Sequence, residues 1–237
     1  MTAYTTAFYK SNMQDSIASA REIIPIVFKI IQPLSVIDFG CGIGSWLSVC
    51  KENGVKEIIG LDGDYIDQSL LIINKCEFRK CDLNNEIALD KCYDMVISLE
   101  VAEHIEQANS KAFVKNLIRH GDNILFSAAI PKQGGVNHVN EQKQSYWARL
   151  FAAYDYVAVD CIRSKIWSND LVCYWYKQNI ILYVRHDCLL KNMLPYVKQP
   201  DEMLDVIHPD FFDTPSRALY LHVLKSVNNI LVQHQNA

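Results

Sequence analysis

The chain has 237 residues, half of them hydrophobic, and a net charge of −4, so it can bury one substantial core together with an appendage. The acidic balance gives no general attraction to a polyanion, which counts against nucleic acid as a partner. The eight cysteines include no C-x-x-C pair, and neither a signal peptide pattern nor a long apolar run occurs. We therefore expect a cytoplasmic protein without a membrane span.

Strands and helices alternate along most of the chain. Short apolar runs bounded by turn residues predict strands at 35–39, 57–61, 77–81, 93–99 and 123–129. Apolar residues at helical spacing predict helices at 13–32 (interrupted at Pro25, which can begin a second short helix), 45–53, 65–74, 108–119 and 141–154. Two more strands, at 156–163 and 172–185, close the regular part.

The order of these elements predicts an α/β fold. Alternating strands and helices favour a parallel sheet with helices on both faces. The last two strands lack a long helix between them and are joined by a short loop, so we expect them to pair as an antiparallel hairpin. The predicted sheet thus has seven strands and is mostly parallel. We divide the chain into an N-terminal helical cap (1–32), a central domain (33–187) and a C-terminal helical appendage (188–237).

The appendage carries an amphipathic helix near 215–233. Its apolar residues fall at helical spacing and form one stripe: Tyr220, Val223, Leu224, Val227 and Leu231. Such a stripe must be covered, so we expect it to pack on the domain or to form a homodimer contact.

The segment 36–44, V-I-D-F-G-C-G-I-G, places a glycine-rich turn between a strand and a helix. Glycine lets the backbone pass close to a ligand, and the following helix begins with unpaired N–H groups. The spacing D-x-G-x-G-x-G, formed by Asp38, Gly40, Gly42 and Gly44, differs from the G-x-G-x-x-G pattern of dinucleotide-binding proteins. It resembles the first motif of class I S-adenosylmethionine-dependent methyltransferases.

That resemblance extends over roughly residues 30–186 and implies a Rossmann-like methyltransferase fold with S-adenosyl-L-methionine as cofactor. Asp62 ends the second strand, where a carboxylate can accept both ribose hydroxyls, and Asp82 ends the third, where the adenine amino group would lie beside Leu83. Each acid alone could equally be a cap or turn residue. The full expected cofactor set is Asp38, Gly40, Gly42, Gly44, Asp62, Gly63, Asp82, Leu83 and Leu99.

The segment 99–105, L-E-V-A-E-H-I, contains the pattern E-x-x-E-H. Positions i, i+3 and i+4 share one face of a helical turn, so Glu100, Glu103 and His104 are expected to converge. His138 follows the fifth strand and would open onto the same pocket. Two carboxylates with one or two imidazoles form a candidate divalent-metal set. The pattern resembles the metal-dependent O-methyltransferases of the ubiquinone-biosynthesis type and the small-RNA 2′-O-methyltransferases.

An ion of the magnesium, manganese, zinc or iron class would hold the acceptor hydroxyl and lower its pKa. Two other interpretations stay open. His104 or His138 could act as a general base without a metal, or Glu103 and His104 could form a structural pair. The predicted catalytic residues are therefore His104, His138 and Glu103, and the predicted metal ligands are Glu100, Glu103, His104 and His138.

The segments 134–142 and 173–179 resemble small-molecule methyltransferases of bacterial polysaccharide and secondary-metabolite pathways. Their aromatic and amide side chains suit a neutral polar ligand such as a sugar. We therefore expect O-methylation of a small metabolite or nucleotide-linked sugar. Three alternatives are retained: methylation of an RNA 2′-hydroxyl or a protein side chain, an NAD(P)-dependent oxidoreductase, and a non-catalytic methyltransferase-like module.

Overall fold

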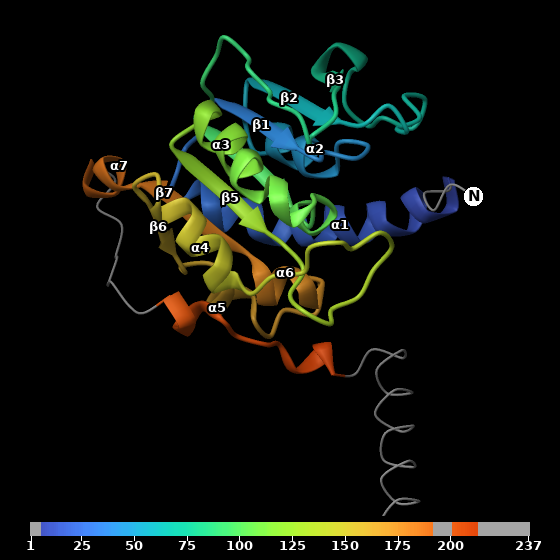
Figure 1. Ribbon diagram of the computed structural model, residues 1–237. Coiled ribbons are helices and arrows are strands. Elements are labelled where there is room, and N and C mark those ends of the chain that lie inside the picture. Colours follow the sequence, from blue (N-terminus) through green and yellow to red (C-terminus); the bar gives the residue numbers. More distant parts are fainter. Residues whose placement is uncertain (1–5, 192–200, 213–237) are drawn as a thin grey trace, which may run out of the picture. The chain divides into compact units, whose positions relative to one another are not determined.

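The computed structural model describes residues 6–191 and 201–212, with side chains described over 14–188 and 201–212 (Figure 1). The chain falls into two compact units, with Val206 ending the first and Ile207 beginning the second. In the second unit the described part holds one 3-10 turn, η5 (Pro209–Phe211). The apolar stripe expected near 215–233 lies outside the described residues, and the predicted three-part division stays a prediction.

A seven-stranded sheet forms the centre of the first unit (Figure 1). Its strands are β1 (Ser35–Phe39), β2 (Glu57–Asp62), β3 (Phe78–Lys80), β4 (Met95–Leu99), β5 (Asn123–Ser127), β6 (Tyr156–Val159) and β7 (Ile181–Arg185). They lie in the order β3-β2-β1-β4-β5-β7-β6. The strand β7 pairs antiparallel with both β5 and β6, and the other neighbours pair parallel. The predicted mostly parallel, Rossmann-like sheet is confirmed.

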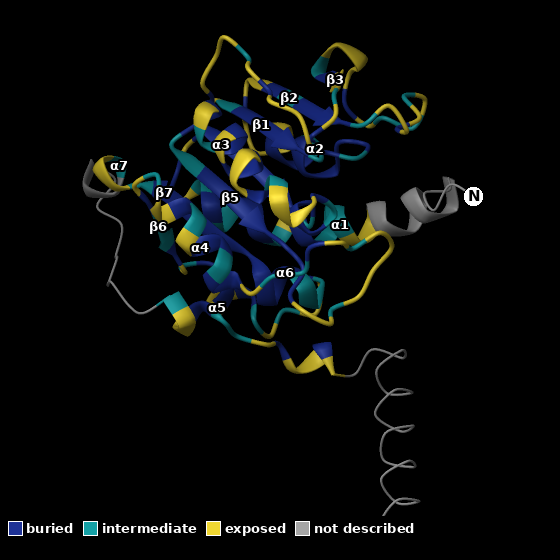
Figure 2. Cartoon of the chain, viewed as in Figure 1, coloured by how far each residue is buried: buried dark blue, intermediate teal, exposed yellow. Residues whose placement is uncertain are grey.

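Helices cover both faces of this sheet (Figures 1 and 2). One face packs against α1 (Thr6–Phe28), α2 (Ser45–Glu52), α5 (Arg163–Ile166) and α6 (Tyr174–Asn179). The other face packs against α3 (Ser110–His120) and α4 (Gln144–Ala152). Alternate strand residues serve the two cores: Val36 packs on the first face and Ile37 on the second, as the two-residue period of a strand requires.

Short elements complete the first unit. They are α7 (His186–Lys191) and the 3-10 turns η1 (Lys75–Glu77), η2 (Ala102–His104), η3 (Gln107–Asn109) and η4 (Asp201–Leu204). Among the described residues, no helix is both long and apolar enough to cross a membrane.

The predicted interruption of the first helix at Pro25 is wrong. The helix α1 continues through Pro25 and ends at Phe28. The proline removes one backbone donor, but fully buried side chains lie on both sides of it, namely Ile23, Ile24 and Val27. Their burial against the sheet holds the helix together across that position.

The helix predicted at 65–74 is also wrong, since this segment forms turns. Asp67 Oδ1 accepts the N–H of Ser69 at 2.9 Å, which competes with a helical backbone. Ile72 N–H donates to the carbonyl of Ile43 at 3.0 Å, and Ile73 is buried in the core. The segment is therefore hydrogen-bonded to the glycine turn and does not form a helix.

The long strand predicted at 172–185 is only partly correct. Its first half forms α6, because Tyr176 packs edge-on against Trp46 with ring centroids 5.1 Å apart. Likewise, the strand predicted at 156–163 ends at Val159 and is followed by α5. Two short helices thus replace the expected short loop between β6 and β7, although these strands do pair antiparallel as predicted.

Candidate functional site

The glycine turn between β1 and α2 has three glycines in the left-handed region, with φ of 91° at Gly40, 56° at Gly42 and 93° at Gly44. A Cβ on Gly40 would collide with Val101, and one on Gly44 would lie 2.8 Å from Ile73. A Cβ on Gly42 would meet nothing within 4 Å. Packing therefore requires glycine at the first and third positions, whereas Gly42 borders open space that a ligand can fill.

A cleft of about 1210 Å³ borders this turn. It lies at the carboxyl ends of the parallel strands, where open α/β sheets bind their ligands. Eight of the predicted site residues line it: Gly40, Gly42, Asp62, Gly63, Asp82, Leu83, Glu100 and His104. The remaining predicted residues are not part of that lining: Asp38, Gly44, Leu99, Glu103 and His138.

Asp62 joins the end of β2 to the glycine turn. Its carboxylate accepts the N–H of Gly42 and the N–H of Gly63, both at 2.7 Å, and the hydroxyl of Tyr65 at 2.6 Å. Burial raises the pKa of Asp62, and these three hydrogen bonds oppose that rise. Tyr65, which the sequence interpretation did not include, therefore occupies one acceptor position of this carboxylate.

The other two strand-end acids differ from each other. Asp38 is buried in β1, and burial followed by the charge of Asp62 holds its pKa well above the ordinary range. Asp82 is exposed and accepts the backbone N–H of Asn84 at 2.9 Å and the amide of Asn85 at 3.1 Å. Asp82 thus organises a turn and lines the cleft at the same time.

Glu100 follows β4 with an uncommon φ of 55°. Its N–H donates to the carbonyl and the hydroxyl of Ser127, at 3.0 and 3.1 Å, which holds this backbone conformation. Its carboxylate accepts the amide groups of Gln133 at 2.8 Å and Asn179 at 3.1 Å. Burial raises the pKa of Glu100 to about 7, against the effect of these hydrogen bonds.

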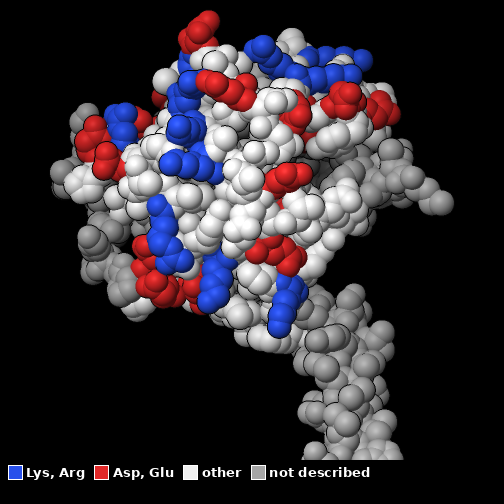
Figure 3. Space-filling model, viewed as in Figure 1, with Lys and Arg blue, Asp and Glu red and all other residues white. Residues whose placement is uncertain are grey.

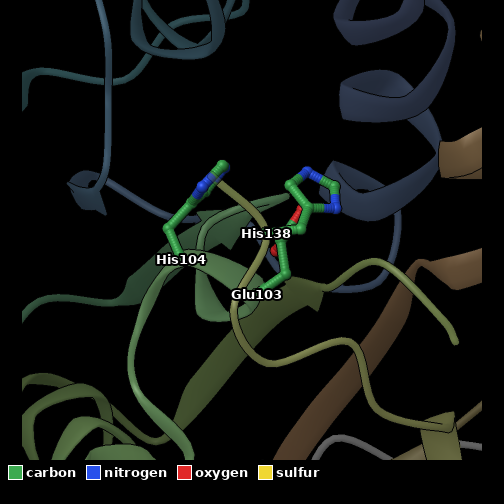
Figure 4. Close-up of side chains that lie close together, drawn as sticks. All are labelled: Glu103, His104 and His138. Atoms are coloured by element: carbon green, nitrogen blue, oxygen red, sulfur yellow. The ribbon is translucent and has the colours of Figure 1, made fainter. Parts of the chain in front are cut away.

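Glu103, His104 and His138 form a separate group, in which one ligand atom from each lies within 4.8 Å of the others (Figure 4). Glu100 is not part of this group. Glu103 is 1% exposed, and neither of its carboxylate oxygens has a hydrogen-bond partner among the described residues. The backbone N–H groups of Glu103 and Ala129 favour the ionised form, but neither makes a hydrogen bond of ordinary geometry. Burial and then the nearby charge of Glu100 raise the pKa of Glu103 well above its usual range.

Both histidines are oriented through Nδ1. His104 Nδ1 lies 3.2 Å from the carbonyl of Asn137, and a carbonyl can only accept, so Nδ1 carries the hydrogen. Burial, followed by the proximity of His138, lowers the pKa of His104. His138 Nδ1 lies 3.0 Å from Glu141 Oε1. The two rings are nearly perpendicular, with centroids 4.9 Å apart, and His104 has its Nε2 lone pair left for binding or for a proton.

The loop that carries His138 is tied directly to η2. The N–H groups of Val139 and Asn140 both donate to the carbonyl of Glu103, at 2.9 and 3.0 Å. The buried amide of Asn140 also donates to the hydroxyl of Ser110 at 2.9 Å. These bonds bring His138 to Glu103 and His104 across a wide separation in sequence.

Four contributors to the site were not among the predicted site residues: Tyr65, Gln133, Glu141 and Asn179. Of these, Glu141 and Asn179 lie in the segments 134–142 and 173–179 that suggested the substrate class. Glu141 stands three residues after His138, a spacing that could have suggested a contact. Gln133 and Asn179 reach Glu100 from distant segments, so no local pattern marks them.

Comparison with known proteins identifies the family. A family model described as a methyltransferase domain matches residues 9–160. The chain belongs to the S-adenosylmethionine-dependent methyltransferases. This confirms the family and fold predicted from the glycine motif and favours them over the oxidoreductase alternative, while the roles of individual site residues stay predictions.

Among curated relatives, the methyltransferase is similar to the ubiquinone biosynthesis O-methyltransferase of Rickettsia typhi (strain ATCC VR-144 / Wilmington). The two are 33% identical over 107 residues, which is 42% of this chain and 41% of that relative. The ubiquinone biosynthesis O-methyltransferase of Rickettsia prowazekii (strain Madrid E) is 33% identical over 98 residues, 38% of this chain and 36% of the relative. The similarity thus spans about two fifths of each relative.

Solved structures share the fold. The sugar N-methyltransferase KedS8 from Streptoalloteichus sp ATCC 53650 superposes with a TM-score of 0.59 at 13% identity, over 78% of this chain and 96% of that one. The magnesium protoporphyrin IX methyltransferase ChlM from Synechocystis PCC 6803, with bound S-adenosylmethionine, gives a TM-score of 0.50 at 18% identity, over 77% and 86% of the two chains.

Proposed function

We propose that this methyltransferase transfers the methyl group of S-adenosylmethionine to a hydroxyl of a small metabolite or nucleotide-linked sugar. The observation that carries the proposal is the group of Glu103, His104 and His138 beside the cleft. Methyl transfer to nitrogen needs no ionised oxygen, whereas an alcohol is a poor nucleophile until its proton is removed. A buried carboxylate with two imidazoles supplies the chemistry for that removal.

The cofactor is assigned to the glycine side of the cleft. Asp62 would accept the ribose hydroxyls, with the Tyr65 hydroxyl giving way to them, and Asp82 with Leu83 would receive the adenine. The cleft lining contains one lysine, Lys80, and five acidic residues, which are Asp62, Asp64, Asp82, Glu100 and Glu106. This negative surrounding suits the positive sulfonium of the cofactor. The chain's task is then to hold methyl donor and acceptor in line and to exclude water.

We further propose that Glu103, His104 and His138 hold a divalent metal ion. A fully buried carboxylate without hydrogen bonds is costly unless it is protonated or binds a cation, and Glu103 is such a group. One carboxylate and two imidazoles form a mixed set of oxygen and nitrogen ligands, which suits an ion such as magnesium, manganese, iron or zinc. When bound, the ion would lower the pKa of the acceptor hydroxyl. Without it, the Nε2 of one histidine would accept the hydroxyl proton.

The charges of the molecule favour a small acceptor over RNA. Beyond the acidic lining of the cleft, patches of both signs alternate on the face drawn in Figure 3, and none dominates it. A phosphate backbone would meet repulsion at the cleft unless cations shielded it. The diphosphate of a nucleotide-linked sugar would meet the same repulsion, so of the two proposed acceptors the charges favour an uncharged small metabolite. Asn137, Asn109 and Val139, which also line the cleft, suit a neutral polar molecule with an apolar edge.

A methyl-transfer assay tests this proposal. Purified protein would be incubated with methyl-labelled S-adenosylmethionine and a panel of sugars, nucleotide sugars and phenols, each with EDTA, with added Mg²⁺ or Mn²⁺, and with a small RNA for comparison. We expect label on a hydroxyl of a small acceptor, lost in EDTA and restored by a divalent cation. Label on RNA alone would contradict the acceptor class. Full activity in EDTA would contradict the metal and leave a histidine as general base.

A further inference from the structure

Glu141 organises the loop that carries His138. Its Oε2 accepts the N–H of Lys132 at 2.6 Å, and its Oε1 accepts the N–H of Gly134 at 2.6 Å. The same Oε1 lies 3.0 Å from Nδ1 of His138. One carboxylate therefore binds three donors, two of them in the backbone and one in an imidazole of the candidate site.

The backbone of this loop is held in uncommon conformations. Lys132, Gly134 and Asn137 have φ of 73°, 74° and 60°, and left-handed φ costs about 1–2 kcal/mol for a residue with a Cβ. The hydrogen bonds to Glu141 contribute to holding two of these three positions. A carboxylate is well suited to this work because charge-assisted hydrogen bonds are stronger than neutral ones.

The His138 ring also has a dedicated space. A Cβ added to Gly135 would collide with Nε2, Cε1 and Cδ2 of that ring. Gly135 is not in the left-handed region, so its backbone conformation does not demand glycine. The absence of a side chain there leaves room for the imidazole, whose position is thus set by Gly135 on one side and Glu141 on the other.

We propose that Glu141 is a positioning residue for His138, which keeps the imidazole in the tautomer with its hydrogen on Nδ1. Nε2 then retains its lone pair. The inference rests on the proposed function, in which His138 acts in the site, but it holds for both versions of that function. A metal ligand and a proton acceptor each need the lone pair, and a ring with its hydrogen on Nε2 could serve as neither at that atom.

The test compares wild type with Glu141→Gln, with Glu141→Ala, which removes both acceptors, and with the control Glu77→Gln. Glutamine can accept at only one of its two terminal atoms, so either Lys132 or the pair Gly134 and His138 loses its acceptor. Glu77 is a fair control, because its carboxylate also accepts a backbone N–H, that of Asn74 at 2.8 Å, and it does not line the cleft.

The first measurement is nitrogen-15 NMR of the histidine rings, without metal, cofactor or acceptor, with the His138 signals assigned by their loss in His138→Asn. We expect hydrogen on Nδ1 in wild type and Glu77→Gln, and a shift toward hydrogen on Nε2 in Glu141→Gln. The second measurement is Co²⁺ titration followed by visible absorption. There we expect binding about 10–100-fold weaker in Glu141→Gln and unchanged in Glu77→Gln.

Each result has a defined meaning. Hydrogen on Nε2 of His138 in wild type overturns the inference, even when the variant does not fold. An unchanged tautomer in folded Glu141→Ala, whose side chain offers no acceptor to Nδ1, overturns it too and leaves Glu141 as a holder of the loop backbone alone. Failure of wild type to bind Co²⁺ would instead remove the metal from the proposed function, and the tautomer measurement would still decide the role of Glu141.

Discussion

Glu100, which is half-buried and lines the cleft, and Glu103, which is buried, are carboxylates three residues apart with different surroundings. The carboxylate of Glu100 accepts two amide groups, from Gln133 and Asn179, whereas the carboxylate of Glu103 has no hydrogen-bond partner among the described residues. A hydrogen-bonded carboxylate can remain ionised in the interior, but an unpartnered one needs a cation or a proton. Of the two acids, Glu103 is therefore the one whose carboxylate needs a cation or a proton, whereas the carboxylate of Glu100 is already hydrogen-bonded.

Glu100 makes the stability of the protein depend on pH. Its pKa is raised to about 7, so between the unfolded value near 4.5 and about 7 the folded state binds more protons than the unfolded state. The free energy of unfolding should then fall as pH rises through this window, by at most about 1.4 kcal/mol per pH unit for one group. Glu100→Gln should flatten that fall, which urea unfolding of metal-free protein from pH 4.5 to 8 would measure. If the free energy of unfolding changed with pH equally in Glu100→Gln and wild type, Glu100 would not be the source of this pH dependence.

At the scale of elements, the glycine turn was predictable because its signals are local. The strand expected at 35–39 is β1, and the helix expected at 45–53 is α2 with one residue fewer. The E-x-x-E-H segment shows the limit of such reasoning. Helical spacing predicted that Glu100 would face Glu103 and His104, but η2 begins only at Ala102, and the positive φ of Glu100 turns the chain before it. The position of that carboxylate depends on Gln133 and Asn179, whose approach no local pattern encodes.

The same local geometry predicts different outcomes for two neighbouring glycines. Gly40→Ala places a Cβ against Val101 at a φ of 91°, so we expect a loss of about 2–4 kcal/mol in unfolding free energy. Gly42→Ala meets no atom within 4 Å and should cost only about 1–2 kcal/mol. Because its methyl group enters the cleft, it should weaken binding of S-adenosylhomocysteine at least about tenfold. Urea unfolding and calorimetry measure the two effects. Full affinity in Gly42→Ala would show that the cofactor does not pass this glycine.

At the scale of the whole molecule, the sheet order brings separate segments to one edge. The glycine turn follows β1, Asp62 ends β2, Glu103 and His104 follow β4, and His138 follows β5. The strands β1, β2, β4 and β5 are neighbours in the parallel part of the sheet, so the residues after them meet at the carboxyl ends. That convergence was predictable from strand order. The proposed division of the site into a cofactor side at the glycine turn and a metal side at Glu103, His104 and His138 was not, because it depends on how the loops fold back on η2.

This division predicts that the two ligands stabilise the protein independently. A ligand present at about 100 times its dissociation constant stabilises the folded state by about 2.7 kcal/mol, equivalent to about 5–10 °C in Tm for a protein of this size. We expect S-adenosylhomocysteine and Mn²⁺ each to raise the Tm of wild type. Asp62→Ala should lose the shift with S-adenosylhomocysteine and keep the shift with Mn²⁺, and Glu103→Gln should show the reverse.

The matched control for the first variant is Asp67→Ala, since Asp67 is an exposed acid that accepts a backbone N–H and does not line the cleft; it should keep both shifts. Retention of the S-adenosylhomocysteine shift in Asp62→Ala would remove Asp62 from the cofactor site. Retention of the Mn²⁺ shift in Glu103→Gln would place the ion elsewhere. Loss of both Tm shifts in either folded variant would show that the two sites are coupled, because a substitution at one site would then also weaken ligand binding at the other.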